Sequence, residues 1–289
     1  MDYIPGLPPT AIEDLPTLFD EVRRKMLPWF REAMSVVNKA QCLLFTSIHE
    51  LEEPVINTLK TRLPIPIYPI GPMIPYFNLQ SDGVCGNDAK HHENHSYFEW
   101  LDSQAPGSVL YISQGSFRSI SHIQLDEIIA GIKQSGVRFL WVTRGDCATC
   151  KDDTGVMGFL VPWCDQLKVL CHPSIRGFWT HCGWNSTWEA IYAGVPMLTC
   201  PIAGDQFSNS KLIVSDWKIG IRAVNNDHKG TLVTRHEIAQ TVKQFMDSQD
   251  DEQKEMVNRA KSLQEICRQA IADGGSAASY LVDFIRDIC

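Results

Sequence analysis

The sequence predicts an α/β protein built around a doubly wound parallel sheet. Short apolar runs rich in Val, Ile, Leu and aromatic residues recur along the chain, at 42–48, 108–113, 137–143, 175–180 and 196–201. Segments with the apolar period of a helix separate these runs. Apolar strands that alternate with helices are typical of a parallel sheet whose two faces are both covered. We therefore expect each strand to lead into a helix that returns the chain to the next strand.

Capping residues indicate where the helices begin and end. The segment 121–136 begins with Ser and ends with Gly, and the segment 184–194 also ends with Gly. Serine accepts hydrogen bonds from the first turn of a helix, and glycine adopts the left-handed conformation that ends one. The tail 237–289 is predicted to be helical, with an interruption at 273–279.

Two stretches without periodicity divide the chain. The Pro-rich stretch 62–75 is predicted to be an interdomain linker, and the polar stretch 78–96 a loop. The part before the linker offers one strand, 42–48, whereas a sheet usually has roughly four to six strands. We interpret that part as the remnant of a larger domain. The expected organisation is an N-terminal remnant at 1–70, a linker and loop at 71–96, a C-terminal domain at 97–272, and a helix at 273–289 that packs back toward the N-terminal part.

Composition and charge exclude several classes of partner. The net charge of −8 argues against nucleic acid, because affinity for a phosphate backbone depends on clustered Lys and Arg. No apolar run reaches about 18 residues, so no transmembrane segment is expected. The first twenty residues lack the apolar core of a secretory signal, and the ten cysteines show no disulfide-framework spacing. A cytoplasmic protein with reduced cysteines is expected.

The loop and helix after the run 175–180 carry the clearest binding signal. His181 and Gly183 are expected to allow a tight turn, and the helix then begins with the free amides of residues 184–186. Such amides, together with the helix dipole, favour an anion such as a diphosphate. Glu189 follows one turn later on the same side, where its carboxylate can accept hydrogen bonds from a diol such as that of a ribose.

A second loop is predicted to face the same crevice. The run 108–113 ends in Ser-Gln-Gly-Ser at 113–116, which offers backbone amides and a hydroxyl. Two such loops suit a nucleotide. The chain contains neither G-x-G-x-x-G nor G-x-x-x-x-G-K-[ST], so the motifs of dinucleotide-dependent oxidoreductases and of P-loop NTPases are both missing.

These residues carry a resemblance to a known family. The 44 residues at 163–206, WCDQLKVLCHPSIRGFWTHCGWNSTWEAIYAGVPMLTCPIAGDQ, resemble the signature box of the plant family-1, or secondary-product, UDP-glycosyltransferases. The resemblance extends in family order through YIPGLPPTAIEDLP, LLFTSIHELE, YPIGP and YFEWLDSQAPGSVLYISQGSF, and so covers nearly the whole chain. It implies a GT-B fold of two facing Rossmann-like domains. The C-terminal domain would bind a UDP-sugar and the N-terminal domain a small hydroxylated acceptor.

The resemblance also assigns roles by matching position. Trp163 would stack on uracil, and Cys164 would meet the edge of the base through its backbone. Glu189 would bind the ribose, while Asp205 and Gln206 would bind the sugar hydroxyls. His181, Asn185 and Ser186, with Ser116, would contact the diphosphate. The full expected donor-binding set is Ser116, Trp163, Cys164, Gln166, His181, Gly183, Trp184, Asn185, Ser186, Glu189, Asp205 and Gln206.

Two details of the box refine this expectation. The pair Trp184-Asn185, with Gln206 closing the box, resembles members that use glucose. Asp165 departs from the proline that is common at its position, although some branches of the family share the sequence WCDQL.

The expected catalytic group is missing from the recognisable motifs. Transfer of a sugar with inversion needs a general base beside the acceptor oxygen, and His suits this role near neutral pH. In the family this His and its Asp lie upstream of the YIPGLPP stretch, and none of the nine histidines here stands in that context.

Two hypotheses follow. The first is a transferase that moves a sugar, expected to be glucose, from UDP to a hydroxyl of a small lipophilic or phenolic metabolite, with this chain an N-terminally truncated record of it. The second is a catalytically inactive remnant that binds the donor only, or a fragment that binds a partner.

Other possible sites are weaker. Cys147 and Cys150 form a C-x-x-C pair in a polar loop without a second pair. His172 is interpreted as structural, because the Cys and His spacing around it does not fit a zinc site. No metal or cofactor is expected.

Overall fold

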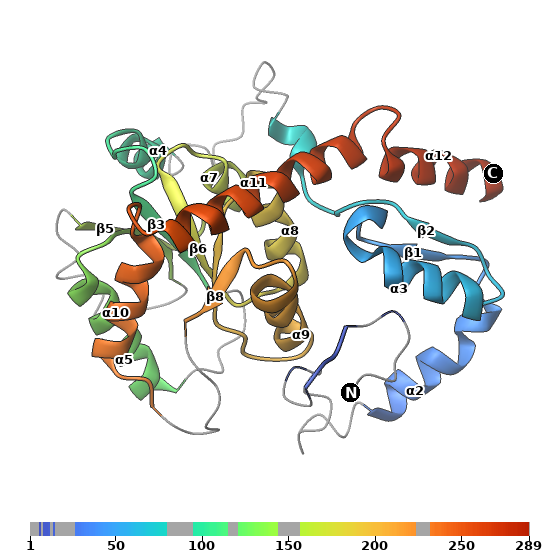
Figure 1. Cartoon of the computed structure of the whole chain (residues 1–289), viewed down its shortest axis with the longest axis horizontal. Helices are drawn as coiled ribbons and strands as arrows, with labels where there is room; N and C mark the ends of the chain where they lie inside the picture. The colour runs from blue at the N-terminus through green and yellow to red at the C-terminus, as the bar shows by residue number, and fades with distance from the viewer. Residues whose placement is uncertain are drawn as a thin grey trace.

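The computed structural model describes residues 6, 8–11, 14, 27–79, 95–114, 121–143, 157–223 and 232–288. These form a larger lobe around a six-stranded sheet and a smaller lobe around a two-stranded sheet (Figure 1). The strands of the larger lobe are β3 (Val109–Ser113), β4 (Arg138–Val142), β5 (Gly158–Val161), β6 (Ile175–Thr180), β7 (Met197–Thr199) and β8 (Gly220–Arg222). Its helices are α4 (His95–Asp102), α5 (His122–Ser135), α7 (Gln166–Leu170), α8 (Trp184–Ala193), α9 (Gln206–Lys211), α10 (Arg235–Met246) and α11 (Asp251–Ile271), with a π-helical turn, η6 (Leu212–Asp216), after α9.

The larger sheet confirms the predicted fold class. Its strand order is β5-β4-β3-β6-β7-β8, and every pairing is parallel. Counted within the lobe this is 3-2-1-4-5-6, the order of the Rossmann fold. Both faces are covered: Leu110 and Ile112 of β3 pack with α5 and α10, while Tyr111 packs with α8 and α11 on the other face. The apolar run that predicts β3 is thus buried on both sides.

The predicted helix caps are present. The Ser121 side chain accepts a hydrogen bond from the amide of Gln124, which caps α5. Gly136 and Gly194 end α5 and α8 with φ of 68° and 71°, the left-handed conformation in which glycine meets no steric penalty. The C-terminal tail is interrupted between α11 and α12 (Ser276–Ile288), but the predicted break at 273–279 is too long, because residues 276–279 already belong to α12. A further break separates α10 from α11.

The smaller lobe corrects one prediction. It contains α2 (Leu27–Val36), β1 (Leu43–Phe45), α3 (His49–Arg62) and β2 (Ile67–Pro69). The short helix η2 (Val37–Lys39) lies between α2 and β1, and the short helix η3 (Tyr76–Leu79) follows β2. β2 lies inside the stretch 62–75 that lacks strand periodicity, and it pairs in parallel with β1. The expectation of a single strand in this region is therefore wrong. A three-residue strand among prolines leaves no pattern to detect, and only the pairing reveals it.

The chain crosses between the lobes more than once. Ile48, just after β1, is fully buried in the core of the larger lobe, which also includes Ile74. At the other end of the chain, α12 extends from the larger lobe onto β2 (Figure 1). There the Tyr68 hydroxyl donates a hydrogen bond to Asp287 at 2.6 Å.

Among the helices of the described residues, none combines the length and the apolar character that crossing a membrane requires.

Candidate functional site

The sheet reverses its direction of winding between β3 and β6, and this reversal locates the candidate site. From β3 the sheet runs on to β4 and β5, whereas from β6 it runs to β7 and β8. Ser113 at the end of β3 pairs in register with Thr180 at the end of β6. Ligands of open α/β sheets bind in the crevice outside the carboxyl ends of the strands at such a reversal. The two loops that the sequence predicts to face one crevice therefore begin side by side.

The loop after β3 supplies a buried donor. Gln114 follows β3 directly, and its Nε2 is buried with no hydrogen-bond partner among the described residues. Buried polar atoms almost always have a partner, so an orphaned amide is free to bind a ligand or water oxygen. Ser116, which the resemblance assigns to the diphosphate, lies outside the described residues.

The loop after β6 brings a second orphaned nitrogen to the crevice. His181 Nδ1 is buried without a partner among the described residues. Burial lowers the pKa of His181, although the charge of Asp205 and the Ser113 carbonyl oppose this effect. The ring is therefore neutral near pH 7, and one of its nitrogens can donate to an oxygen. A Cβ added to Gly183 would stand 2.5 Å from His181 Nε2, so the ring lies directly against the first residue of the next helix.

The turn in this loop differs from the expectation in one respect. The left-handed residue is Cys182, with φ of 65°, whereas Gly183 has the ordinary extended values of −60° and 143°. Gly183 is needed for the close approach of His181 and not for backbone freedom. The Cys182 amide donates to Thr180 Oγ1 at 3.0 Å, and its carbonyl accepts from Asn209 Nδ2 at 2.9 Å. These bonds hold a conformation that is uncommon for a residue with a side chain.

Helix α8 begins at this turn with uncapped amides. Gly183 is its N-cap residue and offers no side chain to bond them. Asn185 is exposed and Ser186 half-buried in the first turn, where the helix dipole favours negative charge. The Trp184 indole points elsewhere, since its Nε1 donates to the Thr46 carbonyl of the smaller lobe at 3.0 Å. Trp184 can therefore face a ligand at this helix end only through its backbone.

A polar network joins the next turn of α8 to α7. Gln166 Nε2 donates to Ser186 Oγ at 2.9 Å and also to a carboxylate oxygen of Glu189. The buried hydroxyl of Tyr111, on β3, donates to Gln166 Oε1 at 3.1 Å. Burial raises the pKa of Glu189, and the Gln166 hydrogen bond only partly offsets this. The network thus holds a half-buried carboxylate near the helix end, although burial disfavours its charge.

Trp163 and Cys164 occupy opposite environments just before α7. Trp163 is 60% exposed, whereas the neighbouring Cys164 is 4% exposed and its Sγ lies 3.3 Å from the Tyr111 hydroxyl. An indole this exposed is unusual beside a buried chain and leaves a ring surface on which a flat base can stack. Burial raises the pKa of Cys164 to about 12, so its thiol is neutral and unreactive.

The residues that close the signature box lie at the start of α9. Asp205 is exposed and Gln206 is buried. Gln206 Oε1 accepts hydrogen bonds from the amides of Ile202 and Ala203, at 2.8 and 2.9 Å. This oxygen is therefore already used within the protein, so the amide nitrogen of Gln206 is the group on this side chain that could bind a ligand.

Asn209 and Tyr111 belong to this site although motif analysis does not select them. Asn209 bonds both Asp205 and the Cys182 carbonyl, and Tyr111 orients Gln166. The spacing of Asn209, four residues after Asp205 on one helix, is a signal that sequence analysis could have used. Tyr111 offers no such signal, because an aromatic residue within an apolar strand is normally interpreted as part of the hydrophobic core.

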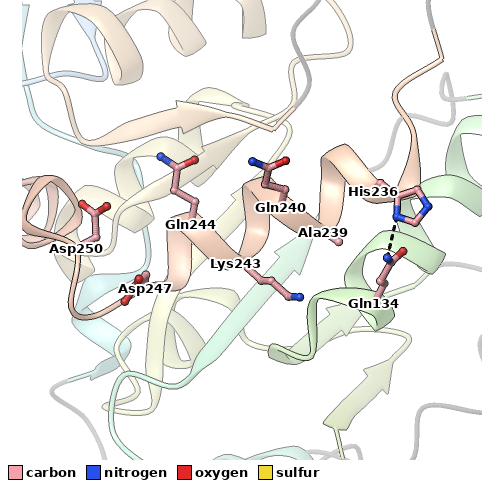
Figure 2. A pocket seen from close by; sticks show the side chains of 8 residues that line it. All are labelled: Gln134, His236, Ala239, Gln240, Lys243, Gln244, Asp247 and Asp250. Atoms are coloured by element: carbon pink, nitrogen blue, oxygen red, sulfur yellow. Dashed lines mark hydrogen bonds between the residues drawn. The ribbon is translucent and has the colours of Figure 1, made fainter.

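The other polar clusters lie apart from this crevice. His172 bonds Asp102 at 3.0 Å and Ser174 at 2.8 Å, which supports a structural role. A groove of about 570 Å³ runs along α10, and its lining residues, shown in Figure 2, are Gln134, His236, Ala239, Gln240, Lys243, Gln244, Asp247 and Asp250. It lies on a flank of the lobe, and none of its lining residues belongs to the expected donor-binding set. Within the described residues no group of three or more His, Cys, Asp or Glu side chains could hold a metal. Cys147 and Cys150 lie outside those residues.

Comparison with known proteins relates this chain to plant enzymes. The sequence matches the family described as UDP-glucoronosyl and UDP-glucosyl transferase over residues 29–268. It is 46% identical over 289 residues to UDP-glycosyltransferase 87A2 of Arabidopsis thaliana, a match covering 100% of this chain and 62% of that protein. UDP-glycosyltransferase 87A1 of the same plant is 44% identical, with coverage of 100% and 64%. The chain thus spans less than two thirds of the length of these relatives.

Solved structures share the fold. Phytolacca americana UGT2, complexed with UDP-2fluoro-glucose and pterostilbene, matches with a TM-score of 0.80 at 31% identity, over 98% of this chain and 61% of that one. Medicago truncatula UGT71G1, complexed with UDP-glucose, matches with a TM-score of 0.82 at 29% identity, over 98% and 62%. Both likenesses include the Rossmann-like lobe and the smaller lobe, so the fold is of the GT-B type. The chain belongs to the plant family-1 UDP-glycosyltransferases.

Proposed function

We propose that this chain binds a UDP-sugar, with UDP-glucose as the preferred donor, in the crevice between the ends of β3 and β6. The observation that carries the proposal is a pair of buried nitrogens, Gln114 Nε2 and His181 Nδ1, at the ends of these adjacent strands. Neither nitrogen has a hydrogen-bond partner within the part of the chain that the structure describes. Together with the uncapped amides of α8, they supply donors for the oxygens of a diphosphate. The exposed ring of Trp163 and the carboxylate of Glu189 add a base platform and a diol acceptor.

The proposed reaction is transfer of the sugar, with inversion, to a hydroxyl of a small lipophilic or phenolic metabolite. Its support is family membership and the solved relatives, one of which is complexed with a UDP-sugar analogue and pterostilbene. We also propose a cytoplasmic location, with the cysteines reduced, in keeping with the six free cysteines among the described residues.

The alternative is donor binding without transfer by this chain. His172 is bonded on both ring nitrogens, and His181 lies against the helix end that would hold the diphosphate. Neither of these two histidines is placed as a base for an acceptor hydroxyl, and a chain that lacked a base would transfer the sugar more slowly by about 10² to 10⁴. Incubation of the purified chain with UDP-glucose and phenols, followed by mass spectrometry of the products, separates the two candidates. A glucoside supports transfer, and UDP-glucose binding without product supports the alternative.

Calorimetric titration with UDP tests the donor site itself. Trp163→Ala should weaken UDP binding by about 5- to 150-fold, because stacking of a base on an aromatic ring contributes roughly 1–3 kcal/mol. Trp29→Ala is the matched control, since Trp29 is 75% exposed but lies on α2 of the smaller lobe. An equal effect of both substitutions, or no binding by the unaltered chain, would refute the proposed site.

A further inference from the structure

Asn209 forms hydrogen bonds to two walls of the proposed donor crevice, the turn after β6 and the loop between β7 and α9. It lies on α9, three residues beyond the end of the signature box, and its side chain is buried. Its Nδ2 donates to the Cys182 carbonyl at 2.9 Å and to Asp205 Oδ2, also at 2.9 Å. An amide NH₂ group has two hydrogens. Both are therefore used, and each bonds a different wall of the crevice.

The first of these bonds stabilises an unfavourable backbone conformation. Cys182 has φ of 65° and its side chain is fully buried. A residue with a Cβ keeps such a conformation only where its surroundings hold it. Thr180 Oγ1 holds the Cys182 amide and Asn209 holds its carbonyl. Because Cys182 stands between His181 and Gly183, this turn directs both the His181 ring and the uncapped start of α8.

The second bond restrains a carboxylate at the other wall. Asp205 is exposed and immediately precedes α9, which has no side-chain cap at its first turn. A free carboxylate at such a position can adopt several rotamers. The bond from Asn209 selects one of them. Burial lowers the pKa of His181, and the negative charge of Asp205 partly offsets this effect, in keeping with the short separation of the two walls.

We propose that Asn209 is a positioning residue that couples the diphosphate-binding turn at Cys182 to the sugar-binding carboxylate of Asp205. The inference rests on the proposed donor function and extends it to a residue outside the signature box. Asn209 acts through its two neighbours and does not itself contact the donor. Loss of its amide should therefore weaken UDP through the turn, and weaken UDP-glucose further through Asp205.

Titration of the full chain with UDP and with UDP-glucose tests this coupling. Loss of one hydrogen bond corresponds to about 3- to 10-fold in affinity. Asn209→Ala should raise the dissociation constant of UDP by about 3- to 10-fold. The dissociation constant of UDP-glucose should rise by the same factor and by a further factor of about 3 to 10 from the loss of the Asp205 contact. Gln253→Ala is the control for loss of a buried amide, since Gln253 is 2% exposed on α11. It should leave both constants unchanged.

A second substitution separates positioning from general support of the fold. Glycine adopts positive φ without penalty, so Cys182→Gly should make the turn independent of Asn209. In that background Asn209→Ala should no longer weaken UDP, while the additional loss of UDP-glucose affinity through Asp205 should persist. A merely structural role for Asn209 predicts no such selective rescue.

The outcomes are distinct. Unchanged constants in Asn209→Ala, equal factors for UDP and UDP-glucose, or failure of Cys182→Gly to restore UDP binding would each overturn the coupling. If the unaltered chain binds neither ligand, the proposed function fails first. If Asn209→Ala does not fold, as judged by near-UV circular dichroism, the near-isosteric Asn209→Asp replaces it. This variant lacks both N–H donors and should again weaken UDP-glucose more than UDP, whereas equal weakening would overturn the proposal.

Discussion

Glu189 shows at the residue scale how a binding group can oppose stability. Its carboxylate is half-buried on α8, and burial raises its pKa from the usual value of 4.5. The folded protein therefore holds this proton more tightly than the unfolded chain does. Stability decreases as pH rises from about 4.5 through the raised pKa, and above that window the penalty for the buried charge is fully present. In the proposed donor site, the charged carboxylate would bind a diol more strongly than a neutral acceptor would.

Replacement of this carboxylate should separate stability from binding. Glu189→Gln keeps an oxygen that can accept from Gln166 but removes the charge. We expect the variant to be at least as stable as the parent at pH 7, with the difference disappearing below about pH 4.5, and to bind UDP about 10-fold more weakly. Thermal unfolding from pH 4 to 8 and calorimetry measure the two effects. A variant that is less stable at pH 7 yet binds UDP normally would contradict both roles.

At the scale of the element, the start of α8 depends on the absence of a single methyl group. Gly183 has backbone angles that any residue adopts, so an alanine there would not strain the chain. Its Cβ would instead stand 2.5 Å from His181 Nε2, which is closer than a real contact. The glycine is therefore required by the histidine ring and not by the turn.

The clash predicts a specific non-additive result. Gly183→Ala should displace the His181 ring over the helix end and weaken UDP binding by about 10-fold or more, while the melting temperature changes little. In a background that carries His181→Ala, the same alanine should have almost no further effect, because the ring that it meets is gone. Calorimetry of the two single variants and the double variant tests this. Additive losses would show that the glycine serves the backbone after all.

At the scale of the whole molecule, contacts far apart in the sequence join the two lobes. Arg222, at the end of β8, bonds the Asp14 carboxylate at 2.7 Å. Trp184 bonds the Thr46 carbonyl, so the helix that begins the donor site also touches the smaller lobe. α12 then crosses to β2, where the ring of Phe284 packs edge-on against the ring of Tyr68, with 5.7 Å between the two ring centroids.

The attachment of α12 can be tested by comparing its two faces. Phe284→Ala should weaken the packing against β2 by about 1–2 kcal/mol and increase hydrogen exchange along α12. Ile285→Ala is the matched control, since Ile285 lies on the same helix and is 51% exposed. We expect the control to leave exchange unchanged. Equal exchange in the two variants would mean that the Phe284 contact does not hold the helix.

Features that arise within short segments could be predicted from the sequence. Periodicity and capping depend on neighbouring residues, so both can be recognised in the sequence. Examples are the buried run of β3, the Ser121 and Gly136 caps of α5 and the glycine before α8. The resemblance of the signature box then indicated the family, since its order and spacing extend over 44 positions.

The hydrogen bonds between groups far apart in the sequence could not be predicted, because they depend on the folded arrangement of the chain. β2 exists because β1 supplies partners for its backbone, and no periodicity over three residues announces it. The indole of Trp184 donates to the carbonyl of Thr46, 138 residues away. The two amide hydrogens of Asn209 bond the Cys182 carbonyl and the Asp205 carboxylate. A side chain has several rotamers and several possible partners, and the packed fold alone selects among them.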